Sequence, residues 1–354
     1  MFHDHTQQGG GNISRVSSVG GFGDLDKDGY NVLVADAHGE NQRLRGNQRD
    51  FVNTFQPDRG LSVDTRGTPY GTVFATGLGN TILSRKSSTG PTLPGGTQAF
   101  NGINPLNLPG AAGCKSVDGT DRYDAKLWDS PQAAYGCAWD TGRAAVLQQE
   151  VRNSNLLARA SVRFGAHEAD VEAVGSQVDT LKSFSPNQIS PNASRFPASS
   201  FYPSTGAAYD QVFNSIVAVF PSIEANRGLP IAYRWRCMEC GNREIATRTE
   251  AGRILLVAQG PHGSWDYPVG ASNAYSKSAS KLGTGYNDTA MLASALGTGI
   301  INPFLAPGLE ESQAAKELIA STSATGSLCT AENLPRPRSM ARSAANSLNC
   351  LPVQ

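Results

Sequence analysis

The stretch "NLLARASVRFGAHEADVEAV", Asn155 to Val174, decides the fold, because its polarity alternates on both sides of a short turn. One face of the first arm carries Leu156, Ala158, Ala160, Val162 and Phe164, and the other carries Leu157, Arg159, Ser161 and Arg163. In the second arm Ala169, Val171 and Ala173 alternate with Glu168, Asp170 and Glu172. Period two predicts a β-hairpin with one apolar and one polar face. Soluble sandwiches and transmembrane barrels both have such hairpins.

Two further hairpins flank this one. The first joins residues 12–22 to 29–38 through the turn that holds Asp24, Asp26, Asp28 and Gly29. That spacing matches the front half of a calcium loop, but position 12 is Ala35 instead of a carboxylate, so a polar turn between strands is favoured. The third hairpin turns at "GPHGS", and Trp265, Tyr267, Val269 and Ala271 then share one face.

Short turns alternate with long polar loops along the chain. We predict loops near 45–150, 182–243 and 282–325, with short helices in the last of them. Loops this long are uncommon in compact domains, whereas outer-membrane barrels combine short periplasmic turns with long extracellular loops. The predicted class is therefore all-β, with antiparallel up-and-down hairpins that form part of a transmembrane β-barrel.

Particular residues mark the turn side of this barrel. The predicted periplasmic turns contain Asp24, Asp26, Asp28 and Gly29, then Gly165 and His167, then Gly260 and Gly263. The aromatic residues Tyr30, Phe164, Trp265 and Tyr267 lie within a few positions of these turns. Aromatic girdles occupy that level in membrane barrels, although aromatic residues are also common in strands of any kind.

Composition limits the function classes. The 354 residues carry a formal net charge of zero, so no nucleic-acid partner is expected. No nucleophile-elbow motif is present, and His3 and His5 lie in an end, residues 1–11, that we predict to be disordered. The expected protein is therefore not an enzyme and has no catalytic residues, cofactor or metal. The N-terminal residues also lack the regions of a secretory signal, so a chain beginning here is expected to stay in the cytoplasm.

The motif "CMEC" at Cys237 to Cys240 has two interpretations. It is half of a zinc ribbon, but no second C-x-x-C motif or nearby histidine pair completes a tetrahedral site. A small disulfide loop in an oxidising compartment is the favoured interpretation.

Several stretches resemble the front of the barrel in TonB-dependent outer-membrane receptors, in the order and spacing of that family. They are "GGGNISRVSSVGGFGDLDKDGYNVLVADAHGENQRLRGNQRDF", "GSWDYPVGASNAYSKS" and "LGTGIINPFLAPG", within a resemblance that covers residues 8–325. It implies a location in the outer membrane, contact with lipid, an inner-membrane energy-coupling partner for the intact receptor, and an unknown large nutrient or siderophore-like substrate. It also implies disulfides between Cys114 and Cys137 and between Cys237 and Cys240, in extracellular loops.

The chain also departs from that family. Residues 12–325 supply about six of the family's twenty-two strands, without its signal, coupling box and plug, so we expect a truncated receptor that transports nothing alone. Pro268 stands at a strand position where it weakens the hydrogen-bond ladder. We expect residues 326–354 to be an unstructured tail produced by a frameshift, in which Cys329 and Cys350 have no role. The alternative class is a soluble or secreted β-rich binding or adhesion module.

Overall fold

The computed structural model describes residues 1–52, 67–83, 102–122 and 135–331. Strands account for 47% of the protein and helices for 18%, so the fold is mostly β. Its strands are β1 Phe2–Asp4, β2 Ile13–Phe22, β3 Tyr30–Asn41, β4 Leu44–Arg45, β5 Thr72–Val73, β6 Thr120–Arg122, β7 Cys137–Trp139, β8 Val146–Gln148, β9 Glu150–Phe164, β10 His167–Ile189, β11 Tyr233–His262, β12 Trp265–Leu282 and β13 Leu328–Ala331. The α-helices of the described residues are α2 Tyr209–Val219, α3 Thr289–Leu296 and α4 Gln313–Ser321, and short 3-10 helices such as Pro221–Asn226 account for further helical residues.

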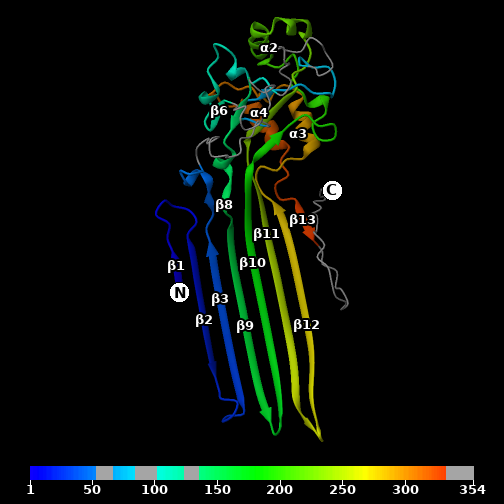
Figure 1. The fold of residues 1–354 in the computed structure, drawn as a ribbon. Coiled ribbons are helices and arrows are strands. Elements are labelled where there is room, and N and C mark those ends of the chain that lie inside the picture. Colours follow the sequence, from blue (N-terminus) through cyan, green and yellow to red (C-terminus); the bar gives the residue numbers. More distant parts are fainter. Residues whose placement is uncertain (53–66, 84–101, 123–134, 332–354) are drawn as a thin grey trace.

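One long antiparallel sheet dominates the molecule (Figure 1). Its strand order is β1-β2-β3-β9-β10-β11-β12-β13, with β5 paired to β11 away from this path. Six of these strands are long, and consecutive ones run up and down with every pair antiparallel. The prediction of antiparallel up-and-down hairpins is confirmed, and the sheet is open within the described residues.

The short turns lie at one end of the sheet, and the loops and helices gather at the other (Figure 1). We call the gathered part the loop cluster; it comprises residues 67–83, 102–122, 135–145, 190–232 and 283–327. The core of the protein lies here, around Tyr202, Phe213, Ile216 and Leu292, which are at most 1% exposed. The strands β2, β3, β9 and β12 bury no hydrophobic side chain. Within the described residues, the long sheet is therefore a single layer, without a second sheet packed on it.

The loop boundaries differ in part from the prediction. β10 continues to Ile189 and β11 begins at Tyr233, so the second connection spans only residues 190–232 instead of 182–243. It contains α2, which was not predicted, whereas the short helices α3 and α4 do lie in the third loop. Strand pairing extends into the polar sequence because backbone hydrogen bonds between adjacent strands do not require apolar side chains.

The two ends of the chain also differ from expectation. Residues 1–11 include β1, where Phe2 pairs with Arg15 of β2, instead of a disordered end. At the other end Leu328–Ala331 forms β13 along β12, so the expected unstructured tail begins with a strand. In both places an unpaired strand edge offers backbone partners to a nearby segment. The rest of the predicted tail, 332–354, lies outside the described residues.

Candidate functional site

The first turn is built by an aspartate side chain. Oδ1 of Asp24 accepts hydrogen bonds from the backbone N–H groups of Asp26 at 3.0 Å and Lys27 at 3.2 Å. The backbone N–H of Asp24 in turn donates to Oδ2 of Asp28 at 2.9 Å. Gly29 follows with a φ of 74°, a conformation that glycine adopts without strain. The carboxylates therefore close a polar turn, as predicted, and no metal-binding group of three ligands occurs in the described part of the chain.

The other two turns are shorter than predicted. Gly165 and Gly263 each begin a two-residue turn, with φ values of 62° and 63°. His167 is the first residue of β10, paired with Phe164, and Gly260 lies inside β11, paired with Tyr267. Assigning His167 and Gly260 to turns was therefore wrong, because glycine at the first turn position lets the strands reverse within two residues.

The predicted interface aromatic residues share one face beside these turns. Strand register places Tyr30 opposite Val162, and Phe164 opposite His167. The hydroxyl of Tyr267 lies 3.0 Å from Nδ1 of His167, whose ring stacks on Phe164 at 5.8 Å. We call this set the aromatic row; its members are Phe22, Tyr30, Phe164, His167, Trp265 and Tyr267. Phe22 and His167 were not predicted members, although their positions one residue from a turn were visible in the sequence.

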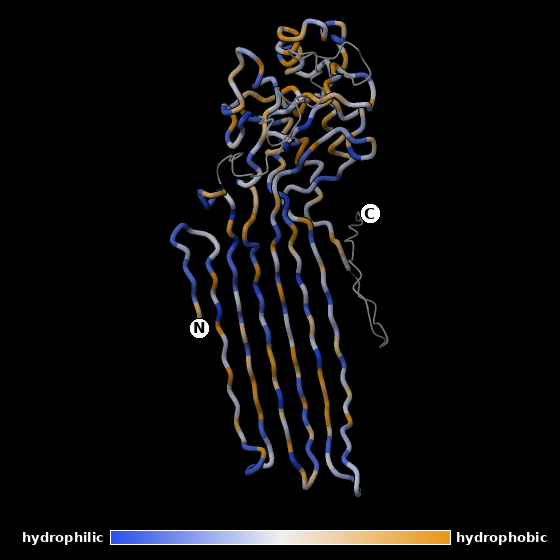
Figure 2. The backbone as a smooth tube through the Cα atoms, viewed as in Figure 1, coloured by the Kyte–Doolittle hydropathy of each residue, from blue (hydrophilic) through white to orange (hydrophobic). Residues whose placement is uncertain are grey.

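Aliphatic side chains occupy the same face next to the aromatic row. We call them the apolar band: Val32, Val34, Leu156, Ala158, Ala160, Val162, Ala169, Val171, Ala173, Ile254, Leu256, Ala258, Val269 and Ala271. Its large members Val34, Leu156, Val162, Val171, Ile254, Leu256 and Val269 are 44% to 57% exposed. Figure 2 shows hydrophobic segments recurring across neighbouring strands in the half of the sheet nearer the turns. Nothing among the described residues covers this band.

The opposite face carries charged side chains at the same level. Arg159 donates to Asp170 through Nη2 at 2.9 Å and Nε at 3.2 Å, and Ser161 donates to the same carboxylate. Arg253 pairs with Glu172, and Arg163 bridges Asp26 and Glu168. We call Arg159, Arg163, Glu168, Asp170, Glu172 and Arg253 the charged row. Asp170 is only 8% exposed, so a carboxylate is more buried than the aliphatic side chains across the sheet.

The face that carries the apolar band becomes polar between the band and the loop cluster. Nε of Arg152 lies 3.3 Å from a carboxylate oxygen of Glu40, and Nε of Arg248 lies 2.7 Å from Oδ1 of Asp179. Along β9 the apolar positions from Leu156 to Phe164 span about 27 Å at about 3.4 Å per residue. The apolar band is therefore bounded by aromatic residues on one side and by ion pairs on the other.

One disulfide lies in the loop cluster and a second lies beside it, in the first part of β11 instead of in a loop. Cys114 and Cys137 form one disulfide, and both residues are almost fully buried. Cys237 and Cys240 form the other, in which Cys237 is fully buried. The pairings that the resemblance implied are both present, and "CMEC" closes on itself instead of offering thiolates to zinc. Cys329, expected to have no role, is buried and disulfide-bonded, whereas Cys350 lies outside the described residues.

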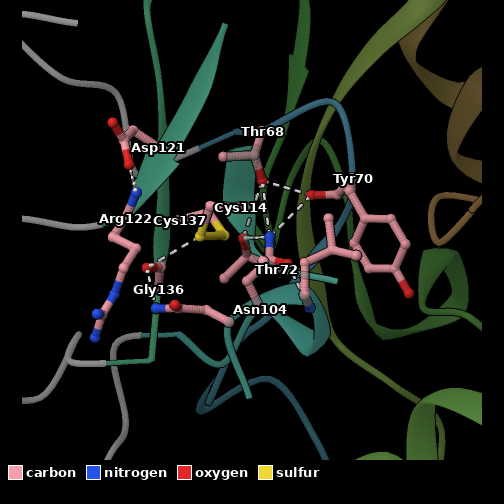
Figure 3. Close-up of a disulfide and its surroundings, with 12 residues drawn as sticks. Thr68, Tyr70, Thr72, Asn104, Cys114, Asp121, Arg122, Gly136 and Cys137 are labelled. Atoms are coloured by element: carbon pink, nitrogen blue, oxygen red, sulfur yellow. Dashed lines mark hydrogen bonds between the residues drawn. A yellow bond between two sulfur atoms is a disulfide. The ribbon is translucent and has the colours of Figure 1, made fainter. Parts of the chain in front are cut away.

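A buried amide organises the segment beside the first disulfide (Figure 3). Nδ2 of Asn104 donates to Oγ1 of Thr72 at 3.0 Å and to the carbonyl of Tyr70 at 3.2 Å. Oγ1 of Thr68 also donates to that carbonyl, at 2.5 Å. These contacts fix the backbone of Tyr70, whose phenol extends away from the disulfide in Figure 3. Sequence reasoning missed this network because its members are spread over 36 positions of loop sequence.

The missed helix α2 did have a sequence signal. Tyr209, Val212, Phe213, Ile216 and Phe220 recur at the spacing of one helical face, and all are at most 6% exposed. The surrounding Ser, Pro and Gly residues obscured this periodicity.

No family model matches the chain, and no curated protein or solved structure shows significant similarity to it. The helices in the described ranges are all too short or too polar to cross a lipid bilayer. The class that the fold defines is a mostly β protein with a single-layer antiparallel up-and-down sheet and a disulfide-bonded loop cluster at one end.

Proposed function

We propose that the six long strands are part of the transmembrane barrel of a TonB-dependent outer-membrane receptor. Such a receptor takes up a large nutrient or siderophore-like molecule with energy passed from the inner membrane. The observation that supports this most is the apolar band, which crosses five neighbouring strands at one level while its large side chains remain about half exposed. Two of the three stretches that resemble the receptor family cover β2, β3 and most of β12.

The two faces of the sheet support a lipid-facing orientation. Aliphatic side chains left in water are unfavourable by about 25 cal/mol for each Å² exposed. A sandwich would bury them beneath a second sheet, but this sheet is a single layer in the described residues. Outer-membrane barrels place an apolar band about 25 Å tall, flanked by aromatic residues, towards lipid, and polar side chains towards the interior. The aromatic row and the charged row occupy the corresponding positions.

The sheet edges add a requirement to this proposal. At the level of the band, β2 from Val16 to Phe22 and β12 from Trp265 to Lys277 have no outer neighbour among the described residues. Unpaired backbone groups are costly in lipid because no water is available to bind them. Further strands, from another segment or chain, must therefore pair with both edges. Pro268 lies on β12 at this level, so one backbone donor is missing from the hydrogen-bond ladder there.

The partners of the proposed receptor follow from this orientation. Outer-membrane lipid contacts the apolar band, and the loop cluster faces the outside, where loops on a rigid scaffold usually carry recognition. The energy-coupling protein of the inner membrane serves the intact receptor only. No catalytic role is proposed.

Flotation with lipid vesicles tests the proposal. The full chain is refolded from denaturant with phosphatidylcholine vesicles, beside the variants Leu256→Arg and Leu255→Arg, which place the same charge on opposite faces. A cation at the lipid-facing midplane costs about 2–4 kcal/mol. We expect wild type and Leu255→Arg to float with the vesicles and Leu256→Arg to be lost from that fraction.

The second candidate is a soluble β-rich binding or adhesion module, favoured by the separate core of the loop cluster and by the two disulfides. Its signature in the same experiment is a chain that remains monomeric in buffer without detergent and does not float. That result would overturn the receptor proposal.

A further inference from the structure

A cavity of about 160 Å³ lies in the loop cluster, at the end of β11. Its lining residues come from four segments far apart in the sequence: Pro69 and Tyr70, Val117, three residues of β11 (Trp235, Met238 and Glu239), and residues 302, 305–309 and 311. At about 30 Å³ for each water, its volume corresponds to about five water molecules, which is the size of a small alkyl group with a polar head. The apolar wall is made by Val117, Met238, Leu305, Pro307 and Leu309, among others.

The charged groups among the described lining residues are acidic. Glu239 and Glu311 line the cavity, and no lysine, arginine or histidine of the described ranges lines it. Glu311 is 6% exposed, and Oε1 of its carboxylate accepts the backbone N–H of Asn302 at 2.9 Å. Burial and the nearby charge of Glu239 raise the pKa of Glu311, whereas hydrogen bonds from Asn302 and Ser312 and the charge of Lys316 oppose that rise. An isolated buried carboxylate is unfavourable unless a positive group compensates it.

A phenol belongs to the same cavity. Tyr70 lines it and is 6% exposed. Burial raises the pKa of this phenol to about 12, so the group is neutral and can donate or accept a hydrogen bond.

The second disulfide shapes the mouth of the cavity. Cys237 and Cys240 close a four-residue loop, and the two residues between them, Met238 and Glu239, both line the cavity while remaining exposed. Lys316, which lies outside the lining, pairs with Glu310 at 2.6 Å. The cavity therefore combines two carboxylates, a neutral phenol and an apolar wall.

We propose that this cavity binds a primary ammonium group carried on a short aliphatic chain. Glu311 accepts a hydrogen bond from the ammonium group, Glu239 adds negative charge at the mouth, and the aliphatic part packs against Met238 and Leu309. The described lining residues include no cation, which disfavours anions, and a neutral ligand would add no positive charge beside the two carboxylates. In the proposed receptor this group is the cationic end of the substrate, an assignment that rests on the proposed function; ammonium binding itself does not.

Calorimetric titration of the full chain in detergent at pH 7 tests the inference, with butylammonium chloride as the probe. Butanol and sodium butyrate, of the same chain length, are the neutral and anionic controls. We expect saturable binding of butylammonium only. Hydrogen bonds to charged groups contribute about 1.5–3 kcal/mol, so Glu311→Gln should weaken binding by about tenfold or more.

Two further variants keep the test decisive. Glu239→Gln changes an exposed side chain that folding does not need, and it should weaken binding severalfold. Glu310→Gln removes an adjacent carboxylate that does not line the cavity, and it should bind like wild type. The inference is overturned by the absence of butylammonium binding, by equal binding of butanol, or by wild-type affinity in both Glu239→Gln and Glu311→Gln. These readouts need no vesicles, so their failure leaves the flotation result intact, and failed flotation leaves ammonium binding intact.

Discussion

Nη2 of Arg159 donates a hydrogen bond to Oδ1 of Asp170 at 2.9 Å, between neighbouring strands and on the face opposite the apolar band. The carboxylate also accepts from Ser161, so two side chains converge on Asp170, which is 8% exposed. The buried positions at this level of the sheet are therefore polar, and the exposed ones include the large aliphatic side chains.

Replacing that carboxylate should destabilise the sheet measurably. In Asp170→Asn the ionic partner of Arg159 is lost, and the expected loss is about 1–2 kcal/mol in the free energy of unfolding, because the guanidinium itself is half exposed. Urea unfolding in detergent measures it. The matched control is Asp26→Asn, which removes a carboxylate that is mostly exposed and pairs with Arg163, and it should leave the unfolding midpoint unchanged. Equal effects of the two variants would contradict the assignment.

The two disulfides should differ in their contribution to stability. The Cys114–Cys137 bond spans 23 positions and the Cys237–Cys240 bond only three. Loop-closure entropy predicts about 3 kcal/mol for the longer loop and about 2 kcal/mol for the shorter one. Double replacement by serine should therefore lower the stability of the loop cluster more for the first pair, as measured by urea unfolding followed by near-UV circular dichroism. The reverse order would mean that the denatured loops are already constrained.

The core of the loop cluster should depend on α2. Phe213 is fully buried, stacks on Tyr209 with ring centroids 5.6 Å apart, and lies below the guanidinium of Arg227. Phe213→Ala should cost about 3–5 kcal/mol because the cavity left behind cannot collapse completely. Faster proteolysis of the loop cluster reports the change. Met291→Ala, at a half-exposed position on α3, should stay within about 0.5 kcal/mol of wild type.

Glu311 should make the loop cluster less stable as the pH rises. Burial raises the pKa of this carboxyl in the folded chain, so the folded state holds the proton more tightly than the unfolded state does. Its contribution is most favourable below the unfolded pKa and is lost as the pH rises through the raised folded pKa. Glu239 acts in the same direction, and Lys316 opposes it.

Thermal unfolding between pH 4 and pH 8 checks this prediction. Glu311→Gln keeps an oxygen acceptor for the N–H of Asn302 but cannot ionise. We expect this variant to flatten the pH profile and to be more stable than wild type at pH 8. An unchanged profile would show that Glu311 ionises without cost in the folded chain.

The strands of the sheet were predictable from the sequence to a large extent. The alternation of polarity in residues 155–174 and 265–271 predicts which side chains share a face of the sheet, for example that Leu156 and Leu157 point to opposite faces. The strand register confirms this prediction. This succeeds because side-chain direction in a strand depends only on position parity. Strand ends were less predictable: β11 reaches from Tyr233 to His262, well beyond its apolar alternation, because pairing with β10 and β12 continues through polar residues.

The contacts of the candidate sites required the fold. Nothing in the local sequence joins Arg253 to Glu172, or Tyr70 to Glu311, because these pairs are brought together by strand register and by loop packing over long separations. The isolated aromatic positions Phe164 and Tyr267 were predicted singly, but their contact through His167 was not.

By itself, the sequence determined which side chains share a face, where the polar turns fall and that the sheet is antiparallel, because alternation and turn chemistry are local properties of the backbone. The tertiary structure alone decided that no second sheet of the described residues covers the apolar face, that Asp170 is buried while Leu256 is exposed, and that two distant glutamates line one cavity. Those features depend on which strands become neighbours and how loops close over them, and neither is set by any single segment.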